Sequence, residues 1–298
     1  MSTIPSFHVA FNLNEGGIPG LGSALASMIS SCSSPDALSI HILGSNLGLV
    51  HKNNVKDLLD SMSYGGRFEF IDYNADEVFK GLPALLGDLT IYGRLLIPEM
   101  IDEPRVLYLD SDVVLTCNVL ELRDVNLEEH ILAAVADRPV SDTPDFPYFR
   151  DRGFPSEMMY FNSGVLLINS ETWRRKNVAA TWREILKDRP DSLPSHDQSV
   201  LNRICGGDYK RLDPKFNTLF YPDVKPQNTQ DAILHFAGSP KPWDISGRML
   251  HNGYSIWKRY CPEKWKRSYL TLNSNKLIRF WHIRRSAIRY MIEYYKRF

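Results

Sequence analysis

Two aspartates follow a hydrophobic segment near the middle of the chain. Asp110 and Asp112 stand two positions apart in RVLYLDSDVVL, directly after an apolar run that begins at Val106. Side chains two residues apart in an extended chain point to the same side, so both carboxylates can reach one ligand. Carboxylate oxygens suit magnesium or manganese, and such an ion can also hold phosphate groups. A solvated turn would carry the same pair, so the spacing alone leaves both interpretations open.

Three further segments with polar groups follow this pair in chain order. They are YFNSGVLLIN at Tyr160–Asn169, SHDQSVLN at Ser195–Asn202 and LHFAGSPKPW at Leu234–Trp243. A single histidine beside a strand, such as His235, is by itself typical of a packed core residue. Asp197 and Gln198 could likewise simply begin a helix. The functional interpretation therefore depends on all four segments occurring together.

In their order and approximate spacing, the four segments resemble family 8 of the glycosyltransferases. This retaining family includes glycogenin and the bacterial lipopolysaccharide α-galactosyl- and α-glucosyltransferases. The resemblance covers roughly Phe7 to Trp243. It implies the α/β fold called GT-A, a single nucleotide-diphospho-sugar-binding Rossmann-like domain with a mostly parallel central sheet. It also implies UDP-galactose or UDP-glucose as the donor and a manganese ion, with magnesium as the alternative.

The resemblance assigns a role to individual residues. Asp110 and Asp112 match two ligands of an ion that bridges the donor phosphates, and His235 matches the third protein ligand. At Gly238 and Lys241, a glycine permits close backbone approach and an ammonium neutralises phosphate charge. The implied catalytic residues are Gln198, Asp197, Asp110 and Asp112. The implied nucleotide-sugar-binding residues are Phe11, Asn12, Asn14, Arg94, Asp110, Ser111, Asp137, Asn162, Ser163, Asp197, Gln198, His235, Gly238 and Lys241.

Two of these positions carry an alternative. Arg94 matches an arginine beside the donor sugar, but a structural salt bridge would explain it equally well. Asn14 stands where the family usually has an aspartate that accepts the uracil N3–H. Asparagine keeps a carbonyl acceptor, so uracil can still be recognised, while its amide donor weakens discrimination against cytosine. The stretch EGGIPG after it is rich in glycine but is not a dinucleotide-binding fingerprint.

Retention of anomeric configuration requires either a covalent intermediate or front-side attack. In this family Gln198 matches the position that faces the anomeric carbon, and an amide is a poorer nucleophile than a carboxylate. Front-side transfer is therefore the favoured hypothesis, with the leaving phosphate oxygen accepting the proton of the acceptor hydroxyl. Asp197 would then bind sugar hydroxyls rather than attack.

Short apolar runs alternate with helix-period segments, which predicts a largely parallel sheet covered by helices. A loop over a site, or a plain linker, is expected at Ser141–Glu157 because this segment is rich in proline, aspartate and aromatic residues. The predicted strands are Phe7–Phe11, Leu38–Leu43, Arg67–Ile71, Val106–Leu109, Ile131–Ala136, Met159–Ile168 and Ile233–Phe236. The predicted helices are Leu21–Ser31, Val55–Ser61, Ile91–Ile97, Thr172–Arg175, Val178–Lys187 and Gln198–Ile204.

Composition narrows the class of protein. The 298 residues include 35 basic and 35 acidic side chains, and this zero net charge gives no reason to expect a nucleic-acid partner. No secretory signal or apolar run of about 18 residues is visible, so a cytoplasmic protein with at most peripheral membrane contact is expected. The cysteines are scattered without metal-binding spacing, which predicts reduced, mostly buried thiols at Cys32, Cys117, Cys205 and Cys261.

The end of the chain differs in charge. From Lys258 onward there are 12 lysines and arginines but only two acidic residues, which predicts a GT-A domain over residues 1–250 and a basic, aromatic-rich helical extension over 251–298. Lys276–Phe298 fits an amphipathic helix. Such a helix suits the inner face of an anionic plasma membrane, although packing on the catalytic domain or on a partner is the alternative. Its predicted apolar side contains Leu277, Phe280, Trp281, Ile288, Met291, Ile292, Tyr295 and Phe298.

These features together predict a hexosyltransferase that acts on a lipid-linked glycan, such as lipopolysaccharide or capsule. One alternative is a glycogenin-like protein that glucosylates one of its own 14 tyrosines. Another is a catalytically silent sugar-nucleotide-binding protein, which the asparagine at position 14 suggests. Galactose and glucose differ at one hydroxyl, and a single pocket substitution can reverse such a preference, so the donor hexose stays open.

Overall fold

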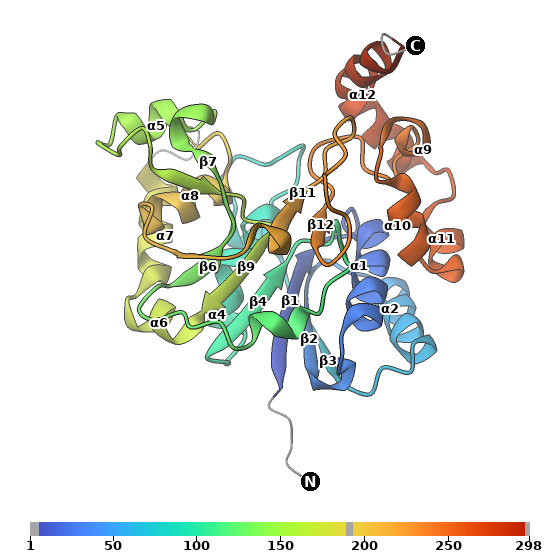
Figure 1. The fold of residues 1–298 in the computed structure, drawn as a ribbon, viewed down its shortest axis with the longest axis horizontal. Helices are drawn as coiled ribbons and strands as arrows, with labels where there is room; N and C mark the ends of the chain where they lie inside the picture. Colours follow the sequence, from blue (N-terminus) through green and yellow to red (C-terminus); the bar gives the residue numbers. More distant parts are fainter. Residues whose placement is uncertain (1–5, 189–192, 296–298) are drawn as a thin grey trace.

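The computed structural model describes residues 6–188 and 193–295, and a seven-stranded sheet runs through its middle (Figure 1). The strand order is β10-β6-β9-β4-β1-β2-β3, and all neighbours are parallel except that β9 runs antiparallel to both β4 and β6. The predicted mostly parallel α/β sheet is therefore confirmed. Its strands are β1 (Phe7–Leu13), β2 (Leu38–Ser45), β3 (Arg67–Tyr73), β4 (Arg105–Leu109), β6 (Leu132–Ala134), β9 (Val165–Asn169) and β10 (Lys210–Arg211).

Helices bury both faces of the sheet. In β1, Val9 and Phe11 belong to one apolar core together with Leu21 of α1, whereas Ala10 belongs to a second core together with Trp173. This alternation explains why the strand reads as a continuous hydrophobic run. On the side of the first core lie α1 (Ile18–Ser31) and α2 (Leu49–Ser61), together with the C-terminal helices described below. The helices on the side of the second core are α4 (Ile97–Met100), α6 (Ser170–Arg175), α7 (Val178–Asp188) and α8 (Asp197–Cys205).

Several predicted elements differ from the structure. The expected strand Met159–Ile168 is two strands, β8 (Met159–Phe161) and β9, because Asn162 accepts a hydrogen bond from the backbone of Gly164 and ends the first. The expected strand Ile131–Ala136 likewise divides into β6 and β7 (Ala136–Pro139), and β7 pairs with β8. The other differences are the short 3₁₀ helix η2 (Thr90–Leu96) before α4, and the helices η4 (Val140–Asp142) and α5 (Phe146–Arg150) within the expected loop.

A small second sheet carries His235, the histidine of the segment LHFAGSPKPW. Strand β5 (Val113–Leu115) pairs antiparallel with β12 (Ile233–His235), and the register sets His235 opposite Val113. The next backbone N–H, that of Phe236, donates to the carbonyl of Asp112 at 2.9 Å. Strand pairing thus brings the histidine to the aspartates, and β11 (Thr218–Leu219) flanks β12 on its other side.

The C-terminal helices begin against α1. Trp257 of α10 (Tyr254–Tyr260) and Trp265 of α11 (Glu263–Tyr269) are buried in the same core as β1. A Cβ atom at Gly22 would lie 2.4 Å from the Trp265 ring, so glycine permits this close approach. The predicted domain boundary at residue 250 stays a prediction. All four cysteines are buried and free, as expected.

The last helix packs by one side only. Helix α12 (Ser274–Tyr295) follows α9 (Gly247–Leu250), α10 and α11 in the chain. Its residues Ile283 and Ala287 are buried. The residues after 295 and the side chain of Tyr295 lie outside the described part. Within the described part, no helix has the length and apolar character needed to cross a membrane. A stripe of exposed apolar side chains runs along α12 and consists of Leu277, Ile278, Trp281, Ile288 and Ile292.

Candidate functional site

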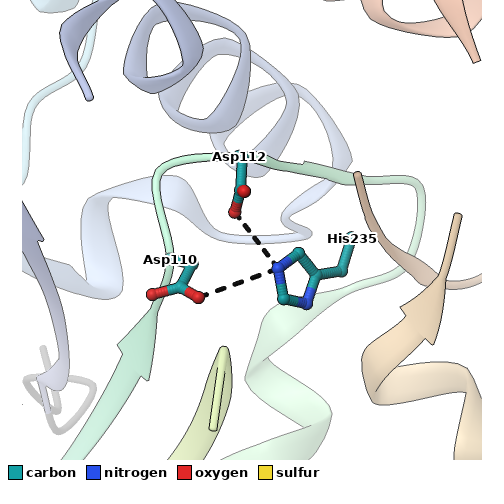
Figure 2. Close-up of side chains that lie close together, drawn as sticks. All are labelled: Asp110, Asp112 and His235. Atoms are coloured by element: carbon teal, nitrogen blue, oxygen red, sulfur yellow. Dashed lines mark ion pairs between the residues drawn. The ribbon is translucent and has the colours of Figure 1, made fainter. Parts of the chain in front are cut away.

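Two carboxylates and one imidazole converge at the end of β4. Asp110 and Asp112 lie in the turn between β4 and β5, and His235 reaches them from β12 (Figure 2). The Nε2 atom of His235 lies 3.2 Å from Asp112 Oδ1 and 3.7 Å from Asp110 Oδ2. One ligand atom from each residue falls within 4.8 Å of the others. The structure thus brings together the three side chains predicted as ligands.

The chemistry of this trio fits a divalent cation. Asp112 Oδ1 is buried and accepts no hydrogen bond from the described residues. Two ligands at right angles around an ion, each about 2.1 Å away, lie about 3 Å apart, which is close to the spacing between Nε2 and that oxygen. An imidazole beside two carboxylates suits manganese better than magnesium. The residues present therefore fit the ion that the family resemblance implies.

Glycines allow other segments to approach the ligand turn closely. A Cβ atom at Gly164 would lie 2.3 Å from His235 Cε1 and 2.7 Å from Asp110 Oδ2. On α1, a Cβ atom at Gly20 would lie 2.5 Å from the carbonyl oxygen of Ser111. Neither site has room for a side chain. Part of the glycine-rich EGGIPG stretch is therefore explained by helix packing against the turn.

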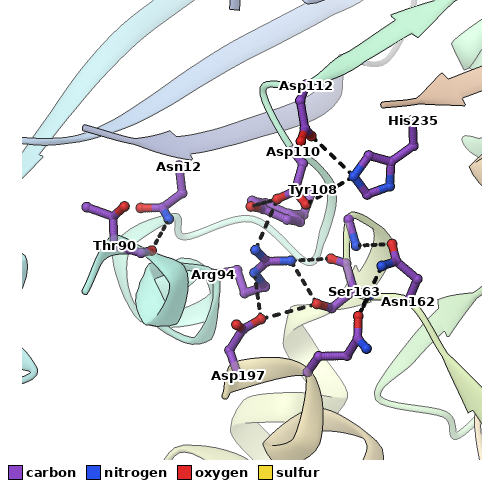
Figure 3. Close-up of polar contacts among 12 residues, drawn as sticks. Asn12, Thr90, Arg94, Tyr108, Asp110, Asp112, Asn162, Ser163, Asp197 and His235 are labelled. Carbon is purple, nitrogen blue, oxygen red and sulfur yellow. Dashed lines mark hydrogen bonds and ion pairs between the residues drawn. The ribbon is translucent and has the colours of Figure 1, made fainter. Parts of the chain in front are cut away.

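Arg94 connects the ligand turn with the start of α8 (Figure 3). Its guanidinium lies 3.1 Å from Asp110 Oδ1 and 3.0 Å from Asp197 Oδ2, and it donates to the carbonyl of Ser163 at 2.6 Å. Burial opposes the charge, but the two carboxylates hold the pKa of Arg94 above its usual range. These contacts are the salt bridge named above as the alternative. A contact with the donor sugar stays a prediction.

Gln198 and Asp197 are both held by neighbouring groups. Gln198 Oε1 accepts hydrogen bonds from Asn162 Nδ2 and from the backbone N–H of Ser163, each at 3.1 Å. A backbone N–H can only donate, so the atom of Gln198 that faces it is the oxygen. The Ser163 hydroxyl also donates to Asp197 Oδ2 at 3.2 Å. The structure therefore gathers these predicted donor-site residues in one network beside the ligand turn.

The protonation of Asp197 makes stability depend on pH. Burial, opposed by Arg94, raises the pKa of Asp197 to about 6. The folded chain then holds this proton between about pH 4 and pH 6, where an unfolded aspartate has lost it. The free energy of unfolding therefore falls as pH rises through that window, by up to ~3 kcal/mol from this group.

We expect Asp197→Asn to remove this contribution. Urea unfolding of both proteins from pH 4 to pH 7 will show the wild type losing stability relative to the variant as pH rises, with no further change above about pH 6. If the free energies of unfolding of the two proteins differed by the same amount at every pH in that range, the raised pKa of Asp197 would be contradicted.

Lys241 lies directly against the ligand turn. Its Nζ is 2.5 Å from Asp112 Oδ2 and also donates to the Phe236 carbonyl. Burial opposes the ionised carboxylate, but the ammonium of Lys241 holds the pKa of Asp112 below its usual range. Asp112 is therefore a charged ligand. The loop reaches Lys241 through Gly238, whose φ of +74° favours glycine, and the phosphate-binding role of both residues stays a prediction.

Three of the predicted nucleotide-sugar-binding residues lie at or just after the end of β1, and Asn14 among them is the predicted base-binding residue. Asn14 Oδ1 accepts from Gly16 N at 2.8 Å and forms the turn before α1. Asn12 donates to the carbonyl of Thr90 at 2.6 Å and accepts from the Tyr73 hydroxyl at 2.6 Å. Phe11 is fully buried in the first apolar core, and its contact with the nucleotide sugar stays a prediction.

A pocket of about 250 Å³ adjoins the network. Asp137 lines it together with Asn162, Asn217 and Thr218, so this predicted residue borders the site. Asp137 also pairs with the neighbouring Arg138 at 2.9 Å. A larger basic hollow lies between α10 and α11 and shares no lining residue with the site.

Sequence reasoning missed three residues of the site. Tyr108 donates to Asp110, and its position two residues earlier on β4 was a usable signal because both side chains point the same way. Gly164 stands inside the YFNSG segment, but its contact with His235 depends on tertiary structure. Asn217, which contacts His235 Nδ1 at 3.0 Å, ends the short 3₁₀ helix η6 (Pro214–Asn217), whose sequence has no recognisable pattern.

Known proteins are similar to this chain over most of its length. The family described as Glycosyl transferase family 8 matches residues 8–246. General stress protein A of Bacillus subtilis is 23% identical over 243 residues, which are 75% of this chain and 82% of that protein. Lipopolysaccharide 1,3-galactosyltransferase of Salmonella typhimurium is 27% identical over 262 residues, which are 83% and 75% of the two chains. Two streptococcal relatives are longer, and the chain spans 24% and 38% of their lengths.

The fold has a close counterpart among solved structures. The galactosyltransferase LgtC, solved with donor and acceptor sugar analogues, is similar with a TM-score of 0.73 at 26% identity. The similarity covers 87% of this chain and 99% of that one. It confirms the predicted GT-A fold.

Proposed function

The chain belongs to glycosyltransferase family 8 and is a glycosyltransferase, and from this premise we propose that it moves galactose or glucose from a UDP-sugar to a saccharide acceptor with retention. The observation that carries the proposal is the convergence of Asp110, Asp112 and His235 beside Gln198 and its hydrogen-bonding neighbours. The similarity to two galactosyltransferases supports a hexose donor.

The proposed ion is manganese, with magnesium as the alternative. Asp110, Asp112 and His235 would hold it, and when bound it would neutralise charge on the two donor phosphates. Lys241 adds a second positive charge at the same place, since its ammonium already lies against Asp112. Breaking the sugar–phosphate bond leaves a diphosphate whose negative charge needs this stabilisation.

We propose front-side transfer at the anomeric carbon. The bond from this carbon to the phosphate oxygen breaks, the bond to the acceptor oxygen forms on the same face, and the acceptor proton passes to the leaving phosphate oxygen. Gln198 Oε1 is held by two N–H donors and Asp197 by Arg94 and Ser163, so neither offers a free nucleophile. A trapped glycosyl adduct on Asp197 or Gln198 would overturn this mechanism.

The proposal is tested by a donor screen. The protein is incubated with manganese and UDP-galactose, UDP-glucose or the matching CDP-sugars, and released nucleotide diphosphate and intact protein mass are measured. We expect UDP release from one UDP-hexose and no added mass. Added hexose mass would favour the glycogenin-like alternative, and absence of any turnover would favour the silent binding protein.

The proposed acceptor is lipid-linked, with the enzyme at the inner face of the plasma membrane. The exposed apolar stripe of α12 supports this, because it lies beside arginines that would meet anionic headgroups. The Cζ atom of Arg284 lies 3.9 Å from the centre of the Trp281 ring. This stacking allows a charged side chain to lie next to the exposed apolar residues. The hollow between α10 and α11 adds Lys258, Arg259 and Lys266 to the basic surface of the C-terminal helices.

Replacing both Trp281 and Ile288 by serine is expected to weaken binding to anionic vesicles at least ~10-fold, since two exposed apolar side chains no longer insert. Vesicle flotation measures the bound fraction. The matched control replaces Leu49 and Val50, two apolar residues of α2 that are even more exposed, by serine and should leave binding unchanged. If both variants bound the vesicles as strongly as the wild type, the membrane proposal would be wrong. The proposed transferase activity would not be affected by that result.

A further inference from the structure

Asn217 lies behind His235, on the side of the ring away from the aspartates. Its side chain is buried, its Oδ1 lies 3.0 Å from His235 Nδ1, and its Nδ2 donates to Asn162 Oδ1 at 3.0 Å. We propose that Asn217 is a positioning residue that holds His235 in the tautomer whose Nε2 binds the ion, and that it links this ligand to the residues around the donor hexose. The inference rests on the metal site of the proposed function.

The orientation of each amide follows from one backbone donor. Gly164 N donates to Asn162 at 3.0 Å, and because a backbone N–H cannot accept, this atom of Asn162 is the oxygen. Asn217 therefore presents its NH₂ group to that oxygen, and its own oxygen faces His235. An oxygen neighbour requires a proton on Nδ1, which leaves the lone pair of the neutral imidazole on Nε2.

Nε2 is also the ring atom that faces the two aspartates. Metal-bound histidines typically donate their other ring N–H to an oxygen acceptor, which fixes the ring and raises its basicity. The arrangement of His235 and Asn217 has this form. The ring also has little freedom to turn, because it is 4% exposed and the backbone of Gly164 lies against it.

The same contacts continue toward the donor site. Asn162 accepts from Asn217 and donates through Nδ2 to Gln198 Oε1 at 3.1 Å. An unbroken series of hydrogen bonds therefore joins His235, through two asparagines, to the side chain that is proposed to face the anomeric carbon. A change at Asn217 should therefore affect both His235 and Gln198.

A role in packing alone is the competing explanation, and two substitutions distinguish it. Asn217→Asp keeps an oxygen against Nδ1 but removes the NH₂ donor to Asn162. Asn217→Leu keeps the size of the side chain but removes both polar contacts. A packing role predicts that any loss follows thermal stability, whereas positioning predicts that only the leucine variant loses the ion.

Manganese binding, measured by electron paramagnetic resonance, is the first readout. We expect Asn217→Leu to bind manganese 10- to 100-fold more weakly than the wild type, the usual effect of losing an outer-shell partner. Asn217→Asp should bind it as tightly as the wild type but turn over donor more slowly at saturating manganese. The exposed Asn126, changed to leucine and to aspartate, serves as the matched control and should alter neither quantity.

The second readout needs no ion. In ¹⁵N-histidine spectra of metal-free protein, with His235→Gln used for assignment, the His235 proton should reside on Nδ1 in the wild type and Asn217→Asp. Asn217→Leu should show a mixture of tautomers. Equal manganese binding by the wild type and a folded leucine variant would overturn the role of Asn217 alone. Failure of the wild type to bind manganese would overturn the proposed metal site together with it.

Discussion

Asp112→Asn is expected to lower the transfer rate at least ~10³-fold, because it removes a charged ligand whose ion contributes several kcal/mol to stabilising the leaving diphosphate. The variant keeps the size of the side chain, so the turn between β4 and β5 should survive. The amide that replaces the Asp112 carboxylate can no longer offer an anionic oxygen to an ion held together with His235 Nε2, which lies 3.2 Å from Asp112 Oδ1 in the wild type. Released UDP, measured over a manganese titration, gives both the rate and the apparent metal affinity.

The matched control is Asp124→Asn, at a carboxylate whose side chain is 80% exposed and pairs with the adjacent Arg123. It should retain wild-type activity and metal affinity. Thermal unfolding of both variants shows whether lost activity reflects lost folding, since Asp112 also neutralises Lys241. A folded Asp112→Asn protein with near-normal manganese-dependent transfer would mean that this carboxylate does not hold the ion.

Gly164→Ala is expected to have the second-largest effect, with loss of manganese binding and at least ~100-fold lower transfer, the upper range for disturbing the surroundings of a metal ligand. The added methyl would meet His235 Cε1 at 2.3 Å and Asp110 Oδ2 at 2.7 Å, so two ligands must move apart. The same shift would disturb the backbone N–H that orients Asn162. Manganese titration by paramagnetic resonance and donor turnover measure the two consequences.

Gly48→Ala is the appropriate control, because a Cβ atom there would have its nearest neighbour at 3.9 Å. This variant should bind manganese and turn over donor like the wild type. If Gly164→Ala also did so while folded, the ligand turn would be more adaptable than its packing implies.

Much of the main sheet could be predicted from the sequence, and residue spacing alone indicated two of the three proposed metal ligands, whereas His235 was named only through the family resemblance. The apolar run before Asp110 marks β4, and alternation along an extended chain sets the two carboxylates on one side. The histidine could not be placed by such reasoning, because it joins the aspartates only through the pairing of β5 with β12. Strand β5 has three residues and follows β4 after a short turn, so the two apolar runs are hard to separate in the sequence.

The remaining errors have the same origin in tertiary contacts. YFNSGVLLIN appears continuous, and only the hydrogen bond from Gly164 to Asn162 shows that a turn divides it into two strands. Along α12, hydrophobicity identified an apolar side but could not tell which residues pack inward. The structure buries Ile283 and Ala287 and leaves Trp281 exposed.

The most direct test of the metal site is a crystal structure of the protein grown with manganese and UDP, with anomalous scattering recorded to locate the ion. We predict one manganese peak about 2.2 Å from a carboxylate oxygen of Asp110, a carboxylate oxygen of Asp112 and Nε2 of His235, with the diphosphate completing its coordination. Manganese bound elsewhere, or UDP bound while these three side chains point away from one another, would contradict the account.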